Sequence, residues 1–413
     1  MRRLVIGLLL MAVACGQAGP PSSPVGVVTK TPSVAESAEP SPSPSPAPSP
    51  QSSPLALPSA YRSLLFAVTE GKAGSNPWVL NAVAIAGLDG HVRARTTFAP
   101  VPQPTMGCMG PILPPSAHVA AGKVYYVDAK GVVRSLAVDG TVTTVATFPM
   151  TSSQQMISFA VSPDGGRVLG TVFTIPKNAF PCDGAFTAAA FSFDAYTAVS
   201  GQASKRVYHL SWTHLPAKIM ELTGWDALGP IGQYPAVWGT QGGGPGLDLG
   251  VFVRIDPTTI KARSNFSDPS SCLTWSSVAS GDFVCTGNAV ADPTDESGYL
   301  YQQPVSVRRA SGRQSWHFSV SGINGAYGPV LAPDSQHVLI CCNTTDSGVL
   351  QEWLVGRDGS KVVAANGFSP EGWLDSRMLI GYSDKGLTYA LSADLTRFAT
   401  IAVAGEFLGT VRP

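Results

Sequence analysis

Val161-Ser162-Pro163-Asp164-Gly165-Gly166-Arg167-Val168-Leu169 is the stretch that decides the fold of this chain. An apolar run enters a Pro-Asp-Gly turn and a second apolar run leaves it, which is the pattern of two antiparallel strands joined by a tight turn. A degenerate copy follows at Leu331-Ala332-Pro333-Asp334-Ser335-Gln336-His337-Val338-Leu339. The recurrence of one hairpin type at distant positions indicates a repetitive, all-β structure.

Other turns of the chain repeat the same arrangement. Asp-Gly pairs lie between strand-like runs at Leu88–Val92, Val138–Val142 and Arg357–Lys361, as two-residue hairpin loops require. The apolar runs are short and rich in Val, Phe, Tyr and Thr, and helical periodicity is almost absent.

The apolar-Ser-Pro-Asp-Gly-x-x-Val/Leu hairpin at Ser162 to Leu169 resembles the repeat of TolB-like and WD40-like bacterial β-propellers. This resemblance implies an all-β propeller over residues 59–413, with about seven four-stranded blades, six or eight being alternatives. The run Ile401 to Val411 is expected to pair into the first blade and close the ring. The expected blades cover residues 62–98, 123–148, 157–213, 231–266, 273–318, 328–366 and 370–403.

The main alternative fold is a pair of β-sandwiches. It requires a linker near the middle of the domain, for which Gly242-Gly243-Gly244-Pro245-Gly246 is the candidate. This stretch is more typical of a loop between two strands, so we favour the propeller.

The N-terminus carries the features of an export signal. Basic Arg2 and Arg3 precede the apolar run Leu4 to Ala14, and small residues lead to Cys15. The stretch resembles the lipobox of bacterial lipoproteins, which implies a signal peptide over residues 1–14 and a lipidated Cys15. Ala12 stands where that family usually has Leu, and a plain secretory signal cut nearby is the alternative.

Residues 15–58 are expected to form the lipidated cysteine and a disordered linker. Gly19 to Pro58 is dominated by Pro, Ser and Ala and has too little apolar surface to fold. Alternating prolines favour extended polyproline II geometry, so the segment would tether the propeller to the lipid. We therefore expect an extracytoplasmic protein of the bacterial cell envelope, in the periplasm or on the outer surface, that contacts the bilayer through Cys15.

The balance of charge argues against a nucleic-acid partner. The chain has 27 basic and 27 acidic residues, so it lacks the excess of positive charge that nucleic acids require. We expect a monomer with a protein or glycan partner and no nucleic-acid ligand.

The six cysteines after Cys15 suggest disulfides in an exported protein. Cys272 and Cys285 flank a Ser280-Gly281 turn and are candidates for a hairpin bridge, and Cys108 and Cys182 lie in Gly/Pro-rich loops that could join neighbouring blades. The adjacent Cys341 and Cys342 either form a strained, reducible bond or, as we favour, lie on opposite faces of a strand. No Cys-x-x-Cys occurs and no histidine lies at ligand spacing, so neither a metal site nor a cofactor is expected.

No catalytic motif is found, so no catalytic residue is assigned. The six histidines are dispersed, and the sequence lacks the serine-hydrolase elbow, the zinc-peptidase motif and the phosphate loop. We favour a non-enzymatic binding or scaffolding module for a protein, glycan or small ligand. The alternative is an exported propeller enzyme, a glycan-active hydrolase or lyase, with residues gathered from several blades at the central channel.

An aromatic-rich segment is the candidate binding surface. Residues 209–238 depart from the hairpin rhythm, which suggests an irregular insertion on the scaffold. Its large aromatic residues are Trp212, Trp225, Tyr234 and Trp238, although core packing is the alternative role for each of them.

The lipid anchor leads to a first prediction. Cys15→Ser removes the acceptor thiol, so the variant is expected in the soluble fraction with its propeller still folded, as fractionation and circular dichroism would show. Retention of the folded variant in the membrane fraction would contradict the anchor.

Overall fold

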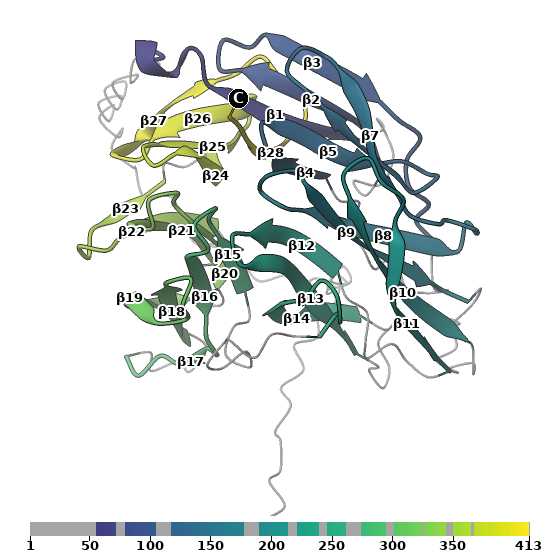
Figure 1. Ribbon diagram of the computed structural model, residues 1–413. Helices are drawn as coiled ribbons and strands as arrows, with labels where there is room; N and C mark the ends of the chain where they lie inside the picture. The colour runs from purple at the N-terminus through teal and green to yellow at the C-terminus, as the bar shows by residue number, and fades with distance from the viewer. Residues whose placement is uncertain are drawn as a thin grey trace, which may run out of the picture. The chain divides into compact units, whose positions relative to one another are not determined.

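The computed structural model describes residues 55–71, 79–104, 117–176, 190–213, 221–238, 246–261, 274–294, 301–323, 326–343, 350–364 and 367–412, with the backbone alone given at some positions near the gaps. The chain divides into two units, residues 1–51 and 52–413, and all described residues belong to the second. This unit is a seven-bladed β-propeller, as predicted (Figure 1). None of the described helices is long and apolar enough to span a membrane.

The first four blades follow one another along the chain, except that the last strand joins the first blade. From the inside outwards they are β28 (Glu406–Val411), β1 (Leu65–Gly71), β2 (Leu80–Gly87) and β3 (Val92–Thr97); β4 (Ala117–Ala120), β5 (Lys123–Val127), β6 (Val132–Leu136) and β7 (Val142–Thr147); β8 (Gln155–Val161), β9 (Arg167–Thr174), β10 (Phe191–Val199) and β11 (Lys205–Trp212); and β12 (Glu221–Asp226), β13 (Gly229–Trp238) and β14 (Gly246–Arg254).

The last three blades complete the ring. Their strands are β15 (Thr274–Ser277), β16 (Phe283–Thr286), β17 (Val290–Ala291), β18 (Tyr301–Arg308) and β19 (Gln314–Ile323); β20 (Ala326–Leu331), β21 (His337–Asn343), β22 (Leu350–Gly356) and β23 (Lys361–Val363); and β24 (Phe368–Asp375), β25 (Met378–Ser383), β26 (Gly386–Leu391) and β27 (Asp394–Thr400). The described part of the fourth blade has three strands, and the short β17 gives the fifth blade an extra one. A short 3-10 helix, η1 (Ser59–Tyr61), precedes the first blade.

The hairpin that identified the fold is fixed by local hydrogen bonds. Ser162 Oγ donates to Asp164 Oδ1 at 2.5 Å and accepts from the Arg167 amide at 2.9 Å. Gly165 adopts a φ of +70°, and a Cβ at this position would lie 2.5 Å from the Tyr125 hydroxyl of the preceding blade. The turn therefore requires glycine for both its conformation and its fit against the neighbouring blade.

The second copy has Ser335 in place of that glycine, at a φ of +59°. Its hydroxyl donates to Asp282 Oδ2 of the preceding blade at 3.2 Å, and its carbonyl accepts from the Trp316 indole at 3.1 Å. These contacts offset the cost of a left-handed serine, so the degenerate repeat keeps its shape.

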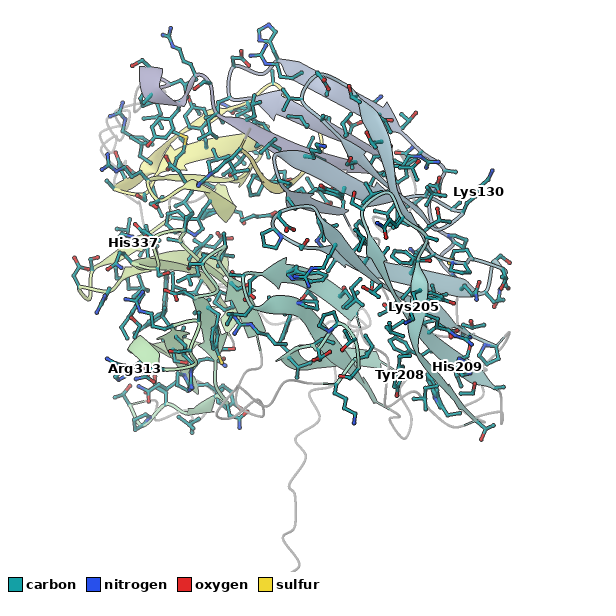
Figure 2. The ribbon with its side chains drawn as sticks, viewed as in Figure 1. Lys130, Lys205, Tyr208, His209, Arg313 and His337 are labelled. Atoms are coloured by element: carbon teal, nitrogen blue, oxygen red, sulfur yellow. The ribbon has the colours of Figure 1, made fainter. Side chains whose placement is uncertain are left out.

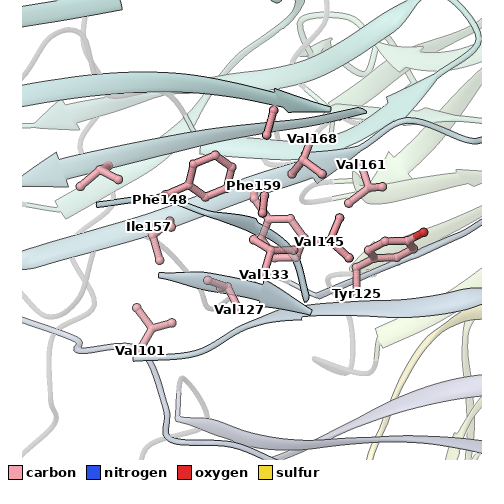
Figure 3. Packing of buried hydrophobic residues seen from close by; sticks show 13 residues of the cluster. Val101, Tyr125, Val127, Val133, Val145, Phe148, Ile157, Phe159, Val161 and Val168 are labelled. Atoms are coloured by element: carbon pink, nitrogen blue, oxygen red, sulfur yellow. The ribbon is translucent and has the colours of Figure 1, made fainter. Parts of the chain in front are cut away.

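The hydrophobic core lies between neighbouring blades. Figure 3 shows one cluster, in which Val127 and Val133 of the second blade face Ile157, Phe159 and Val168 of the third. The other described clusters also draw their buried residues from pairs of neighbouring blades. Each blade is therefore stabilised mainly by the blades on either side of it.

The C-terminal strand closes the ring, as predicted. β28 pairs with β1 in antiparallel register, with Leu65 opposite Val411 and Phe66 opposite Thr410. Residues ahead of the first blade reinforce this junction, because Leu55, Leu57 and Tyr61 pack against the core shared by the seventh and first blades.

The prediction of an irregular insertion over residues 209–238 is wrong. β11 ends at Trp212, and the segment then supplies β12 and β13 of the fourth blade. The hairpin rhythm was obscured because β12 has a register shift between Leu222 and Gly224, which breaks its alternation. Two inner strands, β4 and β12, also lie outside the blade limits predicted from the sequence.

Ring closure gives the second prediction. A chain that ends at Ala404 lacks β28 and its pairing with β1. It also loses the burial of Val411, which stabilises the fold by about 2 kcal/mol. Because domains are stable by only about 5–15 kcal/mol, we expect the cooperative thermal transition to be lost or to move far down in temperature.

A chain that ends at Val411 is the matched control, because it keeps β28 and should unfold near the wild-type temperature. Equal unfolding midpoints for the two truncated chains would contradict the role of β28 in closure.

Candidate functional site

The innermost strands of the seven blades surround a central cavity of about 870 Å³. A second cavity of about 650 Å³ adjoins it and shares lining residues such as Trp225, Ser276 and Val330. Val161 and Pro163 at the end of β8 and Leu408 on β28 complete the contributions of the ring. All seven blades therefore contribute to this space, the candidate site, which we call the channel.

Aliphatic and small residues line much of the channel wall, and polar atoms contribute a comparable share of its surface. Val119, Ala120, Val330 and Leu408 supply aliphatic surface. Gly372 also lines it, and a Cβ there would lie 2.5 Å from the ring of Phe407, so the glycine allows that ring to pack closely. The apolar part of this wall can bind ligands by excluding water.

Hydroxyl groups interrupt the apolar wall. Thr410 Oγ1 lies 3.1 Å and 3.0 Å from the Trp373 and Leu374 carbonyl oxygens, to which it donates, and Ser276 Oγ accepts from the Leu331 amide at 3.3 Å. These bonds tie neighbouring inner strands together across the blade boundaries. They also leave a few polar atoms at fixed positions in the channel, as ligand sites commonly have.

Trp225 is the candidate binding residue that the structure places in the channel. It lies on β12, is partly buried, and the Arg167 guanidinium sits 5.5 Å from the centroid of its indole. This cation–π contact and packing against the core shared by the third and fourth blades orient the indole, part of which faces the channel.

The other three aromatic candidates are not placed there. Trp212 lies on β11 and stacks with Phe173 and Phe191, at centroid distances of 5.9 Å and 5.7 Å, which is a packing role. Tyr234 and Trp238 belong to β13, and their side chains lie outside the described residues.

An acidic residue of the channel, Asp226, is neutralised by a buried ion pair. The side chains of Asp226 and Arg254 are 2% and 3% exposed, and the guanidinium donates to Asp226 Oδ2 through both Nε and Nη2. Arg254 Nη2 also donates to the Gly281 carbonyl of the next blade at 2.9 Å. Since a charge buried without its partner would be costly, this pair has a structural role between the fourth and fifth blades.

His118 lines the channel and is uncharged at neutral pH. Burial lowers its pKa to about 4, and its ring packs edge-on against Phe159 at 4.9 Å. The imidazole is therefore uncharged.

Glutamates from separate strands have raised pKa values. Burial raises the pKa of Glu221, at the start of β12, to about 7. Burial, with an added effect of Glu371, raises the pKa of Glu352 to about 7, and burial together with Glu406 raises that of Glu371. Within the described part of the chain, no three His, Cys, Asp or Glu side chains are arranged to hold a metal ion.

Among the candidate cysteines, only Cys285 falls within the described residues. It is buried on β16, opposite Trp275 of β15. Cys15, Cys108, Cys182 and Cys272 lie outside the described residues, and for Cys341 and Cys342 on β21 only the backbone is described.

Several channel residues were not identified from the sequence. Phe407, Glu371 and Arg412 line the channel, yet their local sequences differ little from those of other strands. Only the order of strands within each blade shows which residues face the axis. The predicted closure by Ile401 to Val411 was the one signal that could have indicated Phe407 and Leu408.

No protein-family model and no curated protein sequence matches the chain. Among solved structures, the chain is similar to Pyrococcus horikoshii acylaminoacyl peptidase, with a TM-score of 0.48 and 11% identity over 82% of this chain and 51% of that one. It is similar to an oligogalacturonate lyase in complex with manganese, with a TM-score of 0.46 and 11% identity over 78% of this chain and 83% of that one. BamB from Moraxella catarrhalis gives a TM-score of 0.35 and 13% identity over 75% and 80% of the two chains. Structural similarity at this level does not indicate an activity.

The raised pKa of Glu221 gives the third prediction. The folded chain keeps this proton up to about pH 7, whereas the unfolded chain releases it near the ordinary value of 4.5. The free energy of unfolding should therefore fall as the pH rises between these values and level off above them.

Glu221→Gln removes this loss. The variant should be more stable than the wild type by about 2 kcal/mol near pH 8 and should differ little near pH 4 in urea unfolding experiments. A difference that does not change with pH would contradict the burial of this carboxyl group.

Proposed function

We propose that this chain is a membrane-tethered, extracytoplasmic lipoprotein whose propeller binds a protein, a glycan or a small ligand in its channel. The proposal is supported by the composition of the channel wall, where Trp225 lies among apolar side chains and hydroxyl groups. Asp226 is already paired with Arg254, so its carboxylate is not free to act on a ligand.

The wall suits an extended segment of peptide or oligosaccharide. The face of an indole can stack on a sugar ring or on an apolar side chain. Thr223, Ser276 and Ser277 offer hydroxyl groups in the same region, which can form hydrogen bonds to backbone amides or to sugar hydroxyls. The channel thus combines aromatic side chains, Trp225 among them, with short polar groups, which favours recognition over chemistry.

An exported propeller enzyme is the second candidate function. Glu221 and Glu352 have pKa values raised to about 7, and carboxyl groups of this kind exchange protons readily at neutral pH. Glu371, which lines the channel, would be the group closest to a bound glycan. A glycan-active hydrolase or lyase is the reaction class that such carboxyl groups would serve.

The lipid anchor and the export signal belong to the same proposal. Their support is the run from Arg2 to Cys15 and the Pro/Ser-rich segment that follows it. In an oxidising compartment we further propose that Cys285 pairs with Cys272, which precedes β15, the partner strand of β16. A bridge between Cys108 and Cys182 is proposed on the same grounds of compartment and position in the sequence.

Trp225→Ala is the fourth prediction. Soluble oligosaccharides and peptides are titrated against the chain while tryptophan fluorescence is followed, and the variant should lose at least about tenfold in affinity, since stacking on one aromatic ring is worth about 1–3 kcal/mol. Trp212→Phe is the matched control, because phenylalanine preserves the stack with Phe173 and Phe191 and lies away from the channel.

Equal affinity of Trp225→Ala and the wild type would contradict binding in the channel. The recovered oligosaccharides separate the two functions. Oligosaccharides that are recovered intact support a binding module. Oligosaccharides that the wild type cleaves and Glu371→Gln does not would establish the enzyme.

A further inference from the structure

A chain of hydrogen bonds links three polar side chains on the outer part of the third blade. His209 Nδ1 lies 2.8 Å from Asp194 Oδ1, and Ser211 Oγ lies 3.0 Å from His209 Nε2. Figure 2 labels His209 on β11, together with Lys205 and Tyr208 of the same strand. No described residue of this group lines the channel, so the cluster is separate from the proposed binding site.

Strand register brings the three residues together. Asp194 on β10 stands directly opposite His209 on β11, and Ser192 stands opposite Ser211. Because side chains alternate along a strand, His209 and Ser211 share one face. Tyr208 takes the opposite face, where its ring packs against Phe193 at 6.0 Å. Packing on that face holds β11 in place, so the polar face has a fixed geometry.

The partners of His209 determine its tautomer. A carboxylate can only accept, so the Nδ1 proton is donated to Asp194, which is 13% exposed. Nε2 is then the acceptor for the Ser211 hydroxyl. Arg206 Nη1, 3.3 Å from the same Asp194 oxygen, helps to hold the carboxylate in this position. In this arrangement a histidine acts as general base toward a serine nucleophile.

We propose that Ser211 is a nucleophile activated by His209 and Asp194, and that it gives the protein an esterase activity toward small activated esters. Ser211 Oγ attacks the ester carbonyl carbon while its proton passes to His209 Nε2. The bond between the acyl carbon and the alkoxy oxygen breaks, the leaving oxygen takes the proton, and acyl-Ser211 remains. In the second step His209 Nε2 takes a proton from water, and the water oxygen bonds to the acyl carbon. The bond between the acyl carbon and Ser211 Oγ breaks, the proton returns from His209 to Ser211 Oγ, and the acid leaves.

The site is open to solvent and accessible to a small substrate. Ser211 is exposed and the His209 side chain is 48% exposed, so the carbonyl of a small ester can approach freely. β11 is the outermost strand of its blade as described, and alternate backbone N–H groups of such an edge strand point away from the sheet. These groups are the donors available to the negative charge that develops on the carbonyl oxygen.

The test uses the full chain in detergent with p-nitrophenyl acetate as the probe. Release of p-nitrophenolate is followed, and acetylated peptides are located by mass spectrometry after a short exposure. Wild type should carry the acetyl group on Ser211. In His209→Gln, Ser211 should be acetylated about 100-fold more slowly than in the wild type, as loss of a general base predicts. The acetylation rate of Asp194→Asn should lie between those of the wild type and His209→Gln.

Ser192→Ala is the matched control. It removes the serine opposite Ser211 and leaves the hydrogen-bond chain intact, so its acetylation rate should equal that of the wild type. The unfolding midpoints of all variants are compared by circular dichroism. Absence of acetyl-Ser211 in the wild type, or an equal rate in folded His209→Gln, would overturn the proposal.

Discussion

The antiparallel pairing of β28 with β1 is the constraint on which the rest of the structure depends. It joins the last strand of the chain to the first blade, from Leu65 opposite Val411 to Thr69 opposite Glu406. Because each described core cluster lies between two blades, an open ring would expose the cluster shared by the seventh and first blades. Closure also places Phe407 and Leu408 on the axis, so the same pairing completes the wall of the channel.

Polar contacts between blades complement the apolar cores. Arg254 connects Asp226 of the fourth blade to the Gly281 carbonyl of the fifth, and Asp282 of the fifth blade accepts from Ser335 of the sixth. These buried groups are satisfied by one another, so they set the position of neighbouring blades at little cost. Of the charged residues that line the channel, Asp226 is thereby neutralised.

Local features of the sequence predicted the fold. Side-chain groupings that depend on strand order and register were not predicted. The hairpin from Ser162 to Leu169 was identifiable because its turn is stabilised within five residues. The role of Phe407 and Glu371 in the channel depends on strand order across the whole ring, which no local pattern carries. Asp194, His209 and Ser211 likewise meet only through the register of β10 and β11. Trp225 was identified because an aromatic residue in an irregular stretch is conspicuous, although strands β11, β12 and β13 make up most of the described part of that stretch.

Amide hydrogen exchange along β28 and β1 tests the closed ring most directly. Both strands belong to one sheet, so their amides should exchange only when the ring opens, and residues 406–411 should be protected to the same degree as residues 65–71. Rapid exchange in residues 406–411 beside a protected β1 would show that the C-terminal strand is not an integral part of the first blade. The channel as described would then lose one of its walls.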